Sequence, residues 1–408
     1  MDGSQSCRSP PRQQHDQSRV QPSEVIDSSA RLLPATNGDE NDSAIQWFGI
    51  DIGGTLAKCV YFETASSSVD LKGTETQGVT ALRNFLKSAV TYGSTGIRDA
   101  KLEMSETIGG QTGTLHFIKF ATSRMDGFFH MVTTNGLASF PKVVCATGGG
   151  AFKFEKDFKE KLGVELMKHD EMECLIRGLH YLCRHDTDEC YYWADPKNPS
   201  VYGCQGTRVP VHLMANPYPY IVVNIGSGVS ILLVESARTF KRIGGTSVGG
   251  GTFLGLCALL TGVESFEEAI ALAGQGDGSK VDKLVRDIYG GGYDRLGLSG
   301  DVVASSFGHM PNPERRTEAS KEDLARASLV TVTNNIGAIA RLSASISGVE
   351  RVLFVGNYLC GNEMSMQMLA YAMEYWSQGS IKALFLKHEG YFGALGAMLH
   401  KLDPDIQQ

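Results

Sequence analysis

The folded part of this 408-residue chain opens with the stretch Trp47-Phe48-Gly49-Ile50-Asp51-Ile52-Gly53-Gly54-Thr55. Its apolar beginning predicts a buried strand that ends in a tight glycine turn, and residues 56–62 predict the antiparallel return strand. Backbone N–H groups that converge in such a turn can bind an anion, and glycine lets a phosphate come close. The stretch therefore predicts a phosphate-binding turn at residues 53–54.

Three more glycine clusters follow expected strands, at residues 148–150, 226–228 and 249–251. One glycine cluster alone is more often a plain turn, but four of them at separate strand ends favour a nucleotide site. The sequence contains neither the P-loop motif G-x-x-x-x-G-K-[ST] nor a strand-anchored G-x-G-x-x-G, which speaks against the P-loop and Rossmann folds.

The second half of the chain repeats the order of the first. Strands expected at 220–224 and 229–235 flank a glycine turn, as strands flank the turn at 53–54. Two such α/β halves predict two lobes with a cleft between them. We expect a disordered tail at 1–44, an N-terminal lobe at 45–218 and a C-terminal lobe at 219–408.

The remaining elements follow from apolar spacing and from glycine or proline at their ends. The helix expected at 320–347 begins with a capping box at Ser320 and Asp323, whereas the proline-containing residues 184–217 are expected to be irregular. We also expect strands at 114–120, 142–147 and 351–355, and helices at 77–92, 170–183, 252–261, 264–274, 278–289, 363–377 and 390–402.

Composition narrows the class of protein. The net charge is -7, and nothing in the sequence resembles a nucleic-acid-binding footprint, so we expect no nucleic-acid partner. No run reaches the roughly 18 apolar residues that a membrane span needs. The nine cysteines form no C-x-x-C pair, which favours reduced, buried thiols. Residues 1–44 carry no secretory or mitochondrial signal pattern, so we expect a cytoplasmic protein and leave a nuclear share open.

Three loops together resemble those of a known superfamily. Residues 51–55 with Lys58 resemble the first phosphate loop of the acetate-kinase, sugar-kinase and actin superfamily. Asn224-Ile225-Gly226-Ser227-Gly228 resembles the second phosphate loop, and Val355-Gly356-Asn357 resembles the adenosine loop. The resemblance implies an α/β fold of two ribonuclease-H-like lobes of the actin-like ATPase/sugar kinase type, with ATP and Mg²⁺ in the cleft.

Longer segments resemble the eukaryotic-type pantothenate kinases in particular. They are residues 145–154, 223–230, 249–256 and 388–394, and the likeness runs from Trp47 to about residue 400. It implies ATP-dependent phosphorylation of pantothenate to 4′-phosphopantothenate, the first step of coenzyme A biosynthesis. It also implies a homodimer and feedback inhibition by acetyl-coenzyme A or another acyl-coenzyme A.

Phosphoryl transfer needs a cation at the γ-phosphate and a metal ion between the phosphates. Lys58 suits the first role and Asp51 the second, although a solvated lysine and a turn-capping aspartate would look the same. Asn224 stands where many superfamily members carry aspartate, which places most of the metal binding on Asp51. By resemblance, the ATP-binding residues are Asp51, Gly53, Gly54, Thr55, Lys58, Gly226, Ser227, Gly249, Gly250, Gly251, Gly356 and Asn357.

The transfer also needs a base for the acceptor hydroxyl, and the resemblance identifies Glu171. Three acids at a helix start, Asp170, Glu171 and Glu173, more often serve the helix dipole, so the sequence alone would not choose one as a base. His169 stands where family members usually carry leucine, and it could affect the neighbouring base.

The acceptor's carboxylate calls for a two-donor cation, and Arg242 is the candidate, although Lys241-Arg242 could also be a surface pair. The resemblance places Ser227 and Ser230 against pantothenate. It also implies that Val303, Ala304 and Trp376 reach the site from the partner subunit, whereas a tryptophan in ordinary core packing is the alternative.

Two other functions stay open at this point. A sugar or amino-sugar kinase shares the same superfamily fold but normally uses an aspartate base before a glycine-rich turn, and it would not need Arg242. A nucleotide-binding regulator without activity is the other alternative, against which the presence of both Glu171 and Arg242 speaks.

Overall fold

The computed structural model describes residues 47–65, 96–136, 140–199, 203 and 205–402. The tail expected at 1–44 and the helix expected at 77–92 lie outside these residues. Within the described ranges, none of the helices is both long and apolar enough to cross a membrane.

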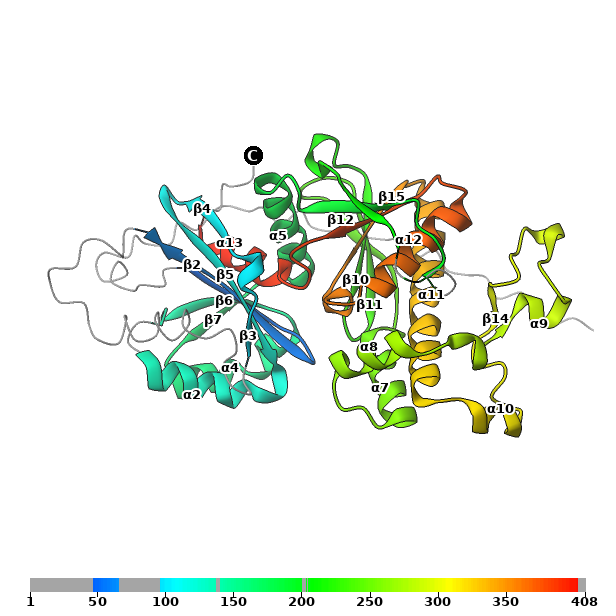
Figure 1. The fold of residues 1–408 in the computed structure, drawn as a ribbon. Coiled ribbons are helices and arrows are strands. Elements are labelled where there is room, and N and C mark those ends of the chain that lie inside the picture. The colour runs from blue at the N-terminus through cyan, green and yellow to red at the C-terminus, as the bar shows by residue number, and fades with distance from the viewer. Residues whose placement is uncertain (1–46, 66–95, 137–139, 200–202, 204, 403–408) are drawn as a thin grey trace, which may run out of the picture. The chain divides into compact units, whose positions relative to one another are not determined.

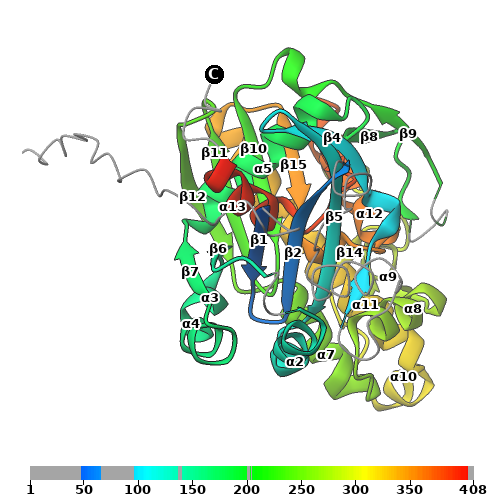
Figure 2. The same cartoon turned by 90° about the vertical axis from the view of Figure 1, so that its left-hand side faces the viewer.

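The first sheet has seven strands in the order β3-β5-β2-β1-β6-β7, with β4 beside β5. β1 pairs antiparallel with β2 and parallel with β6, which confirms the strand–turn–strand prediction at residues 47–62. Figure 2 shows β1, β2 and β5 side by side. Its strands are β1 (Trp47–Ile52), β2 (Leu56–Thr64), β3 (Ile97–Arg98), β4 (Met104–Ile108), β5 (Gln111–Ala121), β6 (Val143–Thr147) and β7 (Glu165–Lys168).

The second sheet also has seven strands, in the order β12-β11-β10-β15-β16-β8-β9. β10 pairs antiparallel with β11 and parallel with β15, so its centre repeats the arrangement of β1, β2 and β6. Its strands are β8 (Cys190–Ala194), β9 (Thr207–Pro210), β10 (Tyr220–Ile225), β11 (Val229–Val234), β12 (Phe240–Thr246), β15 (Arg351–Val355) and β16 (Lys382–Leu386).

The helices confirm most of the expected positions. The capping box of α11 is present, with the Ser320 hydroxyl accepting the Asp323 N–H and the Asp323 carboxylate accepting the Ser320 N–H. The described helices that matter below are α2 (Met125–Gly136), α3 (Gly149–Lys153), α5 (Glu171–His185), α7 (Gly250–Thr261), α8 (Phe266–Gln275), α9 (Val285–Tyr289), α11 (Lys321–Ser347), α12 (Glu363–Ser377) and α13 (Phe392–Leu402).

Two sequence expectations are wrong. Residues 184–217 are not simply irregular, because β8 and β9 form there and extend the second sheet; the prolines around these short strands mask them in the sequence. The helix expected at 278–289 is not continuous: a 3-10 turn forms at Gly278–Lys280 and an α-helix only in α9. Its apolar spacing is interrupted at the buried Asp282, whose carboxylate accepts the Phe307 N–H, and β13 (Lys283–Leu284) pairs with β14 (Val303–Ser305).

The two halves exchange segments. The last helix, α13, packs against β1, β2 and α5 of the first half, and Figure 1 shows it beside those elements. Conversely, β8 and β9 belong to the first half of the sequence but pair within the second sheet. Sheet membership therefore differs from a simple division at residue 219, because strand pairing and helix docking act between segments far apart in sequence.

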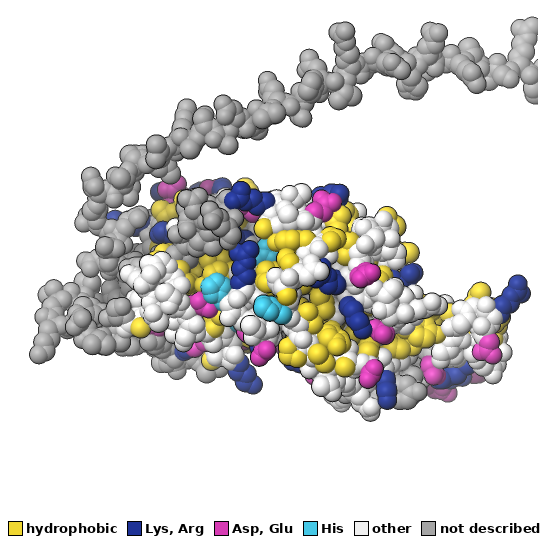
Figure 3. Space-filling view, turned by 90° about the horizontal axis from the view of Figure 1, so that it is seen from above, with side chains coloured by type: hydrophobic (Ala, Val, Ile, Leu, Met, Phe, Trp, Pro, Cys, Tyr) yellow, Lys and Arg dark blue, Asp and Glu magenta, His cyan; other side chains and the backbone are white. Residues whose placement is uncertain are grey.

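A continuous core joins these elements. It includes Phe62 of β2, Leu179 of α5, Leu353 of β15 and Leu395 of α13, all fully buried or nearly so. The amphipathic pattern of residues 170–183 is thus confirmed, because α5 buries its apolar side in this core. The surface is mixed: among the side chains drawn in Figure 3, charges of both signs lie between apolar areas on that face.

Candidate active site

A cleft of about 700 Å³ collects most of the residues that the sequence singled out. Its wall is made by the glycine turns after β1, β10 and β15 together with the starts of α5 and α7. The sequence-predicted residues that line it are Asp51, Gly53, Gly54, Thr55, Lys58, Glu171, Gly226, Ser227, Ser230, Gly250, Gly251, Gly356 and Asn357.

The two expected phosphate loops face each other in this cleft. The hydroxyls of Thr55 and Ser227 lie 3.1 Å apart, which links the turn after β1 to the turn after β10. The Gly251 N–H donates to the Ser227 carbonyl at 3.0 Å, so the start of α7 sits on the second turn. A helix N-terminus attracts anions because its first N–H groups lack helical partners and its dipole is positive there.

Gly249 is placed differently from the prediction. It is the N-cap of α7 and is buried behind the second turn rather than lining the cleft. A Cβ there would lie 2.7 Å from the Ser227 carbonyl oxygen, so only glycine lets the helix start come this close.

Asp51 and Lys58 are paired across the first hairpin. They are register partners in β1 and β2, and the Lys58 Nζ lies 3.7 Å from the Asp51 Oδ2. Both side chains are largely shielded from solvent: 13% of the Lys58 side chain and 15% of the Asp51 side chain are exposed. Gly148 and Gly393 lie against the Asp51 carboxylate, where a Cβ at either position would be closer than 3 Å to it. This packing fixes the carboxylate in the cleft beside the lysine.

The three acids at the start of α5 have three different environments. Asp170 caps the helix and accepts the N–H groups of Met172 and Glu173 at 3.0 and 2.9 Å. The Glu173 carboxylate lies 3.6 Å from the His400 ring. Of the three, only Glu171 lines the cleft. The structure thereby separates the helix-end charges from the one acid that a bound substrate could reach.

The cleft shifts the protonation of Glu171. Its side chain is exposed to the cleft, yet the surrounding walls raise the pKa of the carboxyl above its usual 4.5 by partial desolvation. The negative charge of Asp51 raises this pKa further, and that of Asp170 adds to it, while Lys58 works in the opposite direction. A carboxylate with a raised pKa is a better proton acceptor, as a general base requires.

His169 does not face this cleft. Its ring stacks on His400 of α13 with centroids 4.1 Å apart, and its carbonyl accepts the Thr147 hydroxyl. Burial lowers the pKa of His169, and the charge of Arg177 lowers it further. The histidine therefore supports the start of α5 from behind.

Arg242 lies beside the cleft rather than in its lining. It is exposed on β12, and its guanidinium covers Gly245, which is the register partner of Ser230. A Cβ at Gly245 would overlap that guanidinium and the Val229 carbonyl. Glycine at this position thus lets the arginine lie next to a strand pair that does line the cleft.

Val303, Ala304 and Trp376 are not brought to this cleft within one chain. Val303 and Trp376 line a second cavity of about 700 Å³, which also holds Arg326 and Asp282. Trp376 is 42% exposed, so ordinary core packing does not describe it.

Several cleft residues were missed by the sequence. Leu254, Phe266 and Tyr358 give one wall an apolar and aromatic character suited to a planar base. Gly390 and Gly393 come from the segment 388–394, which had been singled out but given no role. Ser265 is the N-cap of α8, and its hydroxyl accepts the Glu268 N–H. A serine three residues before a glutamate is a local sequence pattern for a helix start, and it could have placed Phe266 at the beginning of this helix.

Comparison with known proteins places most of the chain in one family. The model of the family described as Fumble matches residues 47–400. Pantothenate kinase 1 of Arabidopsis thaliana is 39% identical over 356 residues, covering 86% of this chain and 85% of that protein. The 4′-phosphopantetheine phosphatase of Mus musculus is 39% identical over 358 residues, covering 88% of this chain.

Some of these relatives are much longer. The chain spans 41% of the mouse protein and 40% of pantothenate kinase 2 of Arabidopsis thaliana, to which it is 36% identical. Among solved structures, a ROK family glucokinase from Streptomyces griseus in complex with glucose and AMPPNP aligns with a TM-score of 0.41 and 13% identity. That alignment covers 87% of this chain and 98% of the glucokinase.

Proposed function

Because this chain belongs to the Fumble family, we propose that it transfers the γ-phosphate of ATP to pantothenate, giving 4′-phosphopantothenate for coenzyme A biosynthesis. The observation that carries the proposal is the meeting of Glu171 with Asp51, Lys58 and two opposed phosphate turns in one cleft. The cleft thus offers a base, a cation and anion-binding N–H groups on one set of walls, as phosphoryl transfer requires.

Each group has a defined task in this reaction. The N–H groups of the turns and of the α7 start hold the phosphates, and Lys58 neutralises charge that develops on the transferred group. Glu171 accepts the proton of the pantothenate hydroxyl as its oxygen attacks phosphorus, and ADP leaves. The apolar wall around Phe266 receives the adenine.

The residues also fit Mg²⁺. Asp51 and Asn224 both line the cleft with oxygen atoms, the ligand type that this ion takes alongside substrate phosphates. The ion would supply charge neutralisation between the phosphates. Among the described residues no group of three or more His, Cys, Asp or Glu side chains could hold a metal ion. Mg²⁺ commonly binds through one or two carboxylates, substrate phosphates and water, which this pair of residues would allow.

Substrate recognition completes the proposal. Arg242 binds the pantothenate carboxylate, Ser227 and Ser230 contact its polar groups, and Val303, Ala304 and Trp376 come from the partner in a homodimer. Support for the last point is that Trp376 is 42% exposed, so its side chain is accessible to a second copy of the chain. Acyl-coenzyme A would inhibit by occupying the same cleft.

A turnover assay with purified protein tests the function. ADP release is measured with pantothenate, glucose and N-acetylglucosamine as separate acceptors. Turnover with pantothenate alone supports the proposal, and turnover on a sugar would replace it with a sugar kinase. ADP binding without turnover on any acceptor would indicate a regulator.

Replacing Arg242 should affect the acceptor and spare the nucleotide. Arg242→Gln is expected to raise KM for pantothenate roughly thirtyfold, because a charge-assisted pair with the carboxylate is lost. KM for ATP should change less than about twofold, because the guanidinium packs on Gly245 of β12 and not on a glycine of the expected phosphate turns. Lys241→Gln is the matched control: Lys241 lies next to it on β12, 3.4 Å from Glu235. Equal effects of the two variants would remove Arg242 from the site.

The fall in rate at low pH, the acid limb of the pH–rate profile, should reflect protonation of the Glu171 carboxylate. Because its pKa is raised, kcat/KM for pantothenate should begin to fall at a higher pH than an ordinary glutamate would cause. Asp170→Asn removes one charge that raises this pKa, and asparagine still caps a helix. The limb should therefore move to lower pH in Asp170→Asn and stay in place in Glu173→Gln. An unmoved limb in both variants would argue that another group titrates.

A further inference from the structure

A short segment crosses from the second sheet to the first beside the cleft. Residues 387–391 lead from β16 to α13, and Gly390 within it lines the cleft. A Cβ at Gly390 would lie 3.6 Å from the Asn357 side chain and 3.8 Å from the Lys58 side chain. The segment therefore runs between the turn after β15 and the cation of the first hairpin.

Glu389 holds the turn after β15 through its side chain at Gly356 and through its own carbonyl at Cys360. One carboxylate oxygen accepts the Gly356 N–H at 2.9 Å, and the other accepts the Leu386 N–H at 3.3 Å. The Glu389 carbonyl accepts the Cys360 thiol at 3.2 Å. Gly356 has a φ of +111°, and a Cβ there would overlap the Ile225 carbonyl, so this turn tolerates little displacement.

Burial of the Glu389 carboxyl group destabilises the folded state through lost hydration. Its side chain is 4% exposed, and burial raises the pKa of Glu389 well above the usual 4.5 against the opposing effect of the two N–H groups. Burying an acid costs free energy that hydrogen bonds return only in part. A role in placing Gly356 and Asn357, both in the cleft wall, explains why an acid stands here.

His388 anchors the crossing segment to the first sheet. Its Nδ1 lies 2.6 Å from the Glu189 carboxylate, and its Nε2 lies 2.8 Å from the Leu102 carbonyl. A carbonyl and a carboxylate both accept, so the ring donates from both nitrogens and carries a positive charge. Burial lowers the pKa of His388, but the hydrogen bond to Glu189, the charges of Glu189 and Asp186 and the bond to the Leu102 carbonyl together outweigh it and raise the pKa above 6.5.

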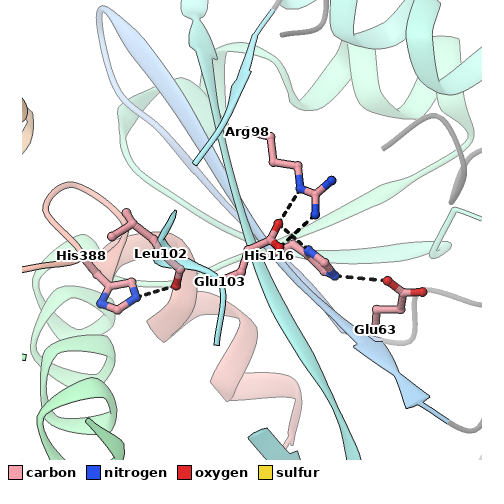
Figure 4. A network of polar contacts seen from close by, with 6 residues as sticks. All are labelled: Glu63, Arg98, Leu102, Glu103, His116 and His388. Carbon is pink, nitrogen blue, oxygen red and sulfur yellow. Dashed lines mark hydrogen bonds and ion pairs between the residues drawn. The ribbon is translucent and has the colours of Figure 1, made fainter. Parts of the chain in front are cut away.

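The anchor point is itself held firmly (Figure 4). Glu103, next to Leu102, binds Arg98 and accepts from His116 at 2.8 Å, and the other nitrogen of His116 lies 3.1 Å from Glu63. These contacts tie the short turn at Ala100–Leu102 to β2 and β5. The first sheet thus offers His388 a fixed carbonyl.

We infer that Glu389 is a positioning residue for the nucleotide, which holds the turn at residues 356–357 in the cleft wall while His388 fixes the segment that carries it. That the ligand of this turn is an adenine nucleotide rests on the proposed function. Glu389 touches backbone N–H groups and not the substrate, so its loss should weaken nucleotide binding more than it slows the chemical step.

Calorimetric binding of ADP to full-length protein without pantothenate is the main measurement. Glu389→Gln is expected to raise the Kd for ADP about tenfold, because an amide offers one acceptor and turns an N–H donor against the other backbone N–H. At saturating ATP, kcat should stay within about threefold, since Glu171 and Lys58 keep their places.

Asp282→Asn is the matched control, because Asp282 is also a buried carboxylate, 1% exposed, that accepts a backbone N–H, from Phe307 at 2.8 Å. It should leave ADP affinity within about twofold. Unchanged ADP affinity in Glu389→Gln, or equal weakening in the control, overturns the inference.

His388→Gln covers the case in which Glu389→Gln does not fold. It loosens the anchor at Leu102 but keeps both bonds of Glu389, so the Kd for ADP should rise about threefold. An unchanged Kd in this variant would also overturn the inference. If the wild-type protein binds ADP but does not phosphorylate pantothenate, the proposed function fails and the inference survives. A wild-type protein that binds no ADP contradicts both.

Discussion

Glu171→Gln is expected to lower kcat for pantothenate phosphorylation about a thousandfold and to leave the Kd for ADP within about twofold. Glutamine has the same shape but cannot accept the proton of the attacking hydroxyl. Folding should be unaffected, because Asp170 and not Glu171 caps α5 and the Glu171 side chain is open to the cleft. Steady-state ADP release and calorimetry on the same preparation measure the two quantities.

Glu173→Gln provides the control for this variant. Glu173 lies two residues further along the same helix turn, but its carboxylate is near His400 instead of lining the cleft. Its kcat should stay within about twofold of the wild type. A Glu171→Gln enzyme that retains more than a tenth of the wild-type kcat would show that Glu171 is not the base.

The second large effect concerns stability. Gly396 of α13 lies directly on α5, and a Cβ at this position would overlap the carbonyl of Cys174. Gly178 of α5 makes the reciprocal approach to the Phe392 carbonyl. Gly396→Ala must push the helices apart along a buried seam, so we expect a loss of at least about 3 kcal/mol in the free energy of unfolding.

Urea denaturation measures this loss. Gly255→Ala in α7 is the control, because no atom other than the helix's own backbone and its chain neighbours lies within 4 Å of the added Cβ, and alanine is the better helix former by about 1 kcal/mol. Its unfolding midpoint should stay equal or rise. Similar midpoints for Gly396→Ala and the wild type would mean that the two helices are not held in contact. Because α5 carries Glu171 at its start, Gly396→Ala should also reduce kcat.

The local parts of the fold could be predicted from the sequence. The hairpins at 47–62 and 220–235 were predicted because apolar runs and glycine turns act between neighbours, and the capping box of α11 was predicted for the same reason. The pairing of β8 with β16 and the docking of α13 on β1 could not be predicted, because each joins segments that are far apart in the sequence.

The site divides in the same way. The glycine turns and Glu171 were predicted as site residues from short motifs that resemble those of a known family, and residues of these motifs line one cleft together. Arg242 was named from the same resemblance, but its position over Gly245 depends on the register of β11 and β12. Glu389 received no role, because a lone glutamate beside a histidine and a glycine indicates solvent contact, and only the tertiary structure shows its carboxylate at Gly356.

The position of α13 also dictates when the protein can finish folding on the ribosome. β1 and β2 are synthesised first, yet the helix that covers them ends at Leu402. Synthesis adds roughly 5–20 residues per second, so the apolar face that α13 later covers stays uncovered for some tens of seconds. A premature stop codon that removed α13 would leave the surfaces of β1, β2 and α5 that this helix covers without their partner.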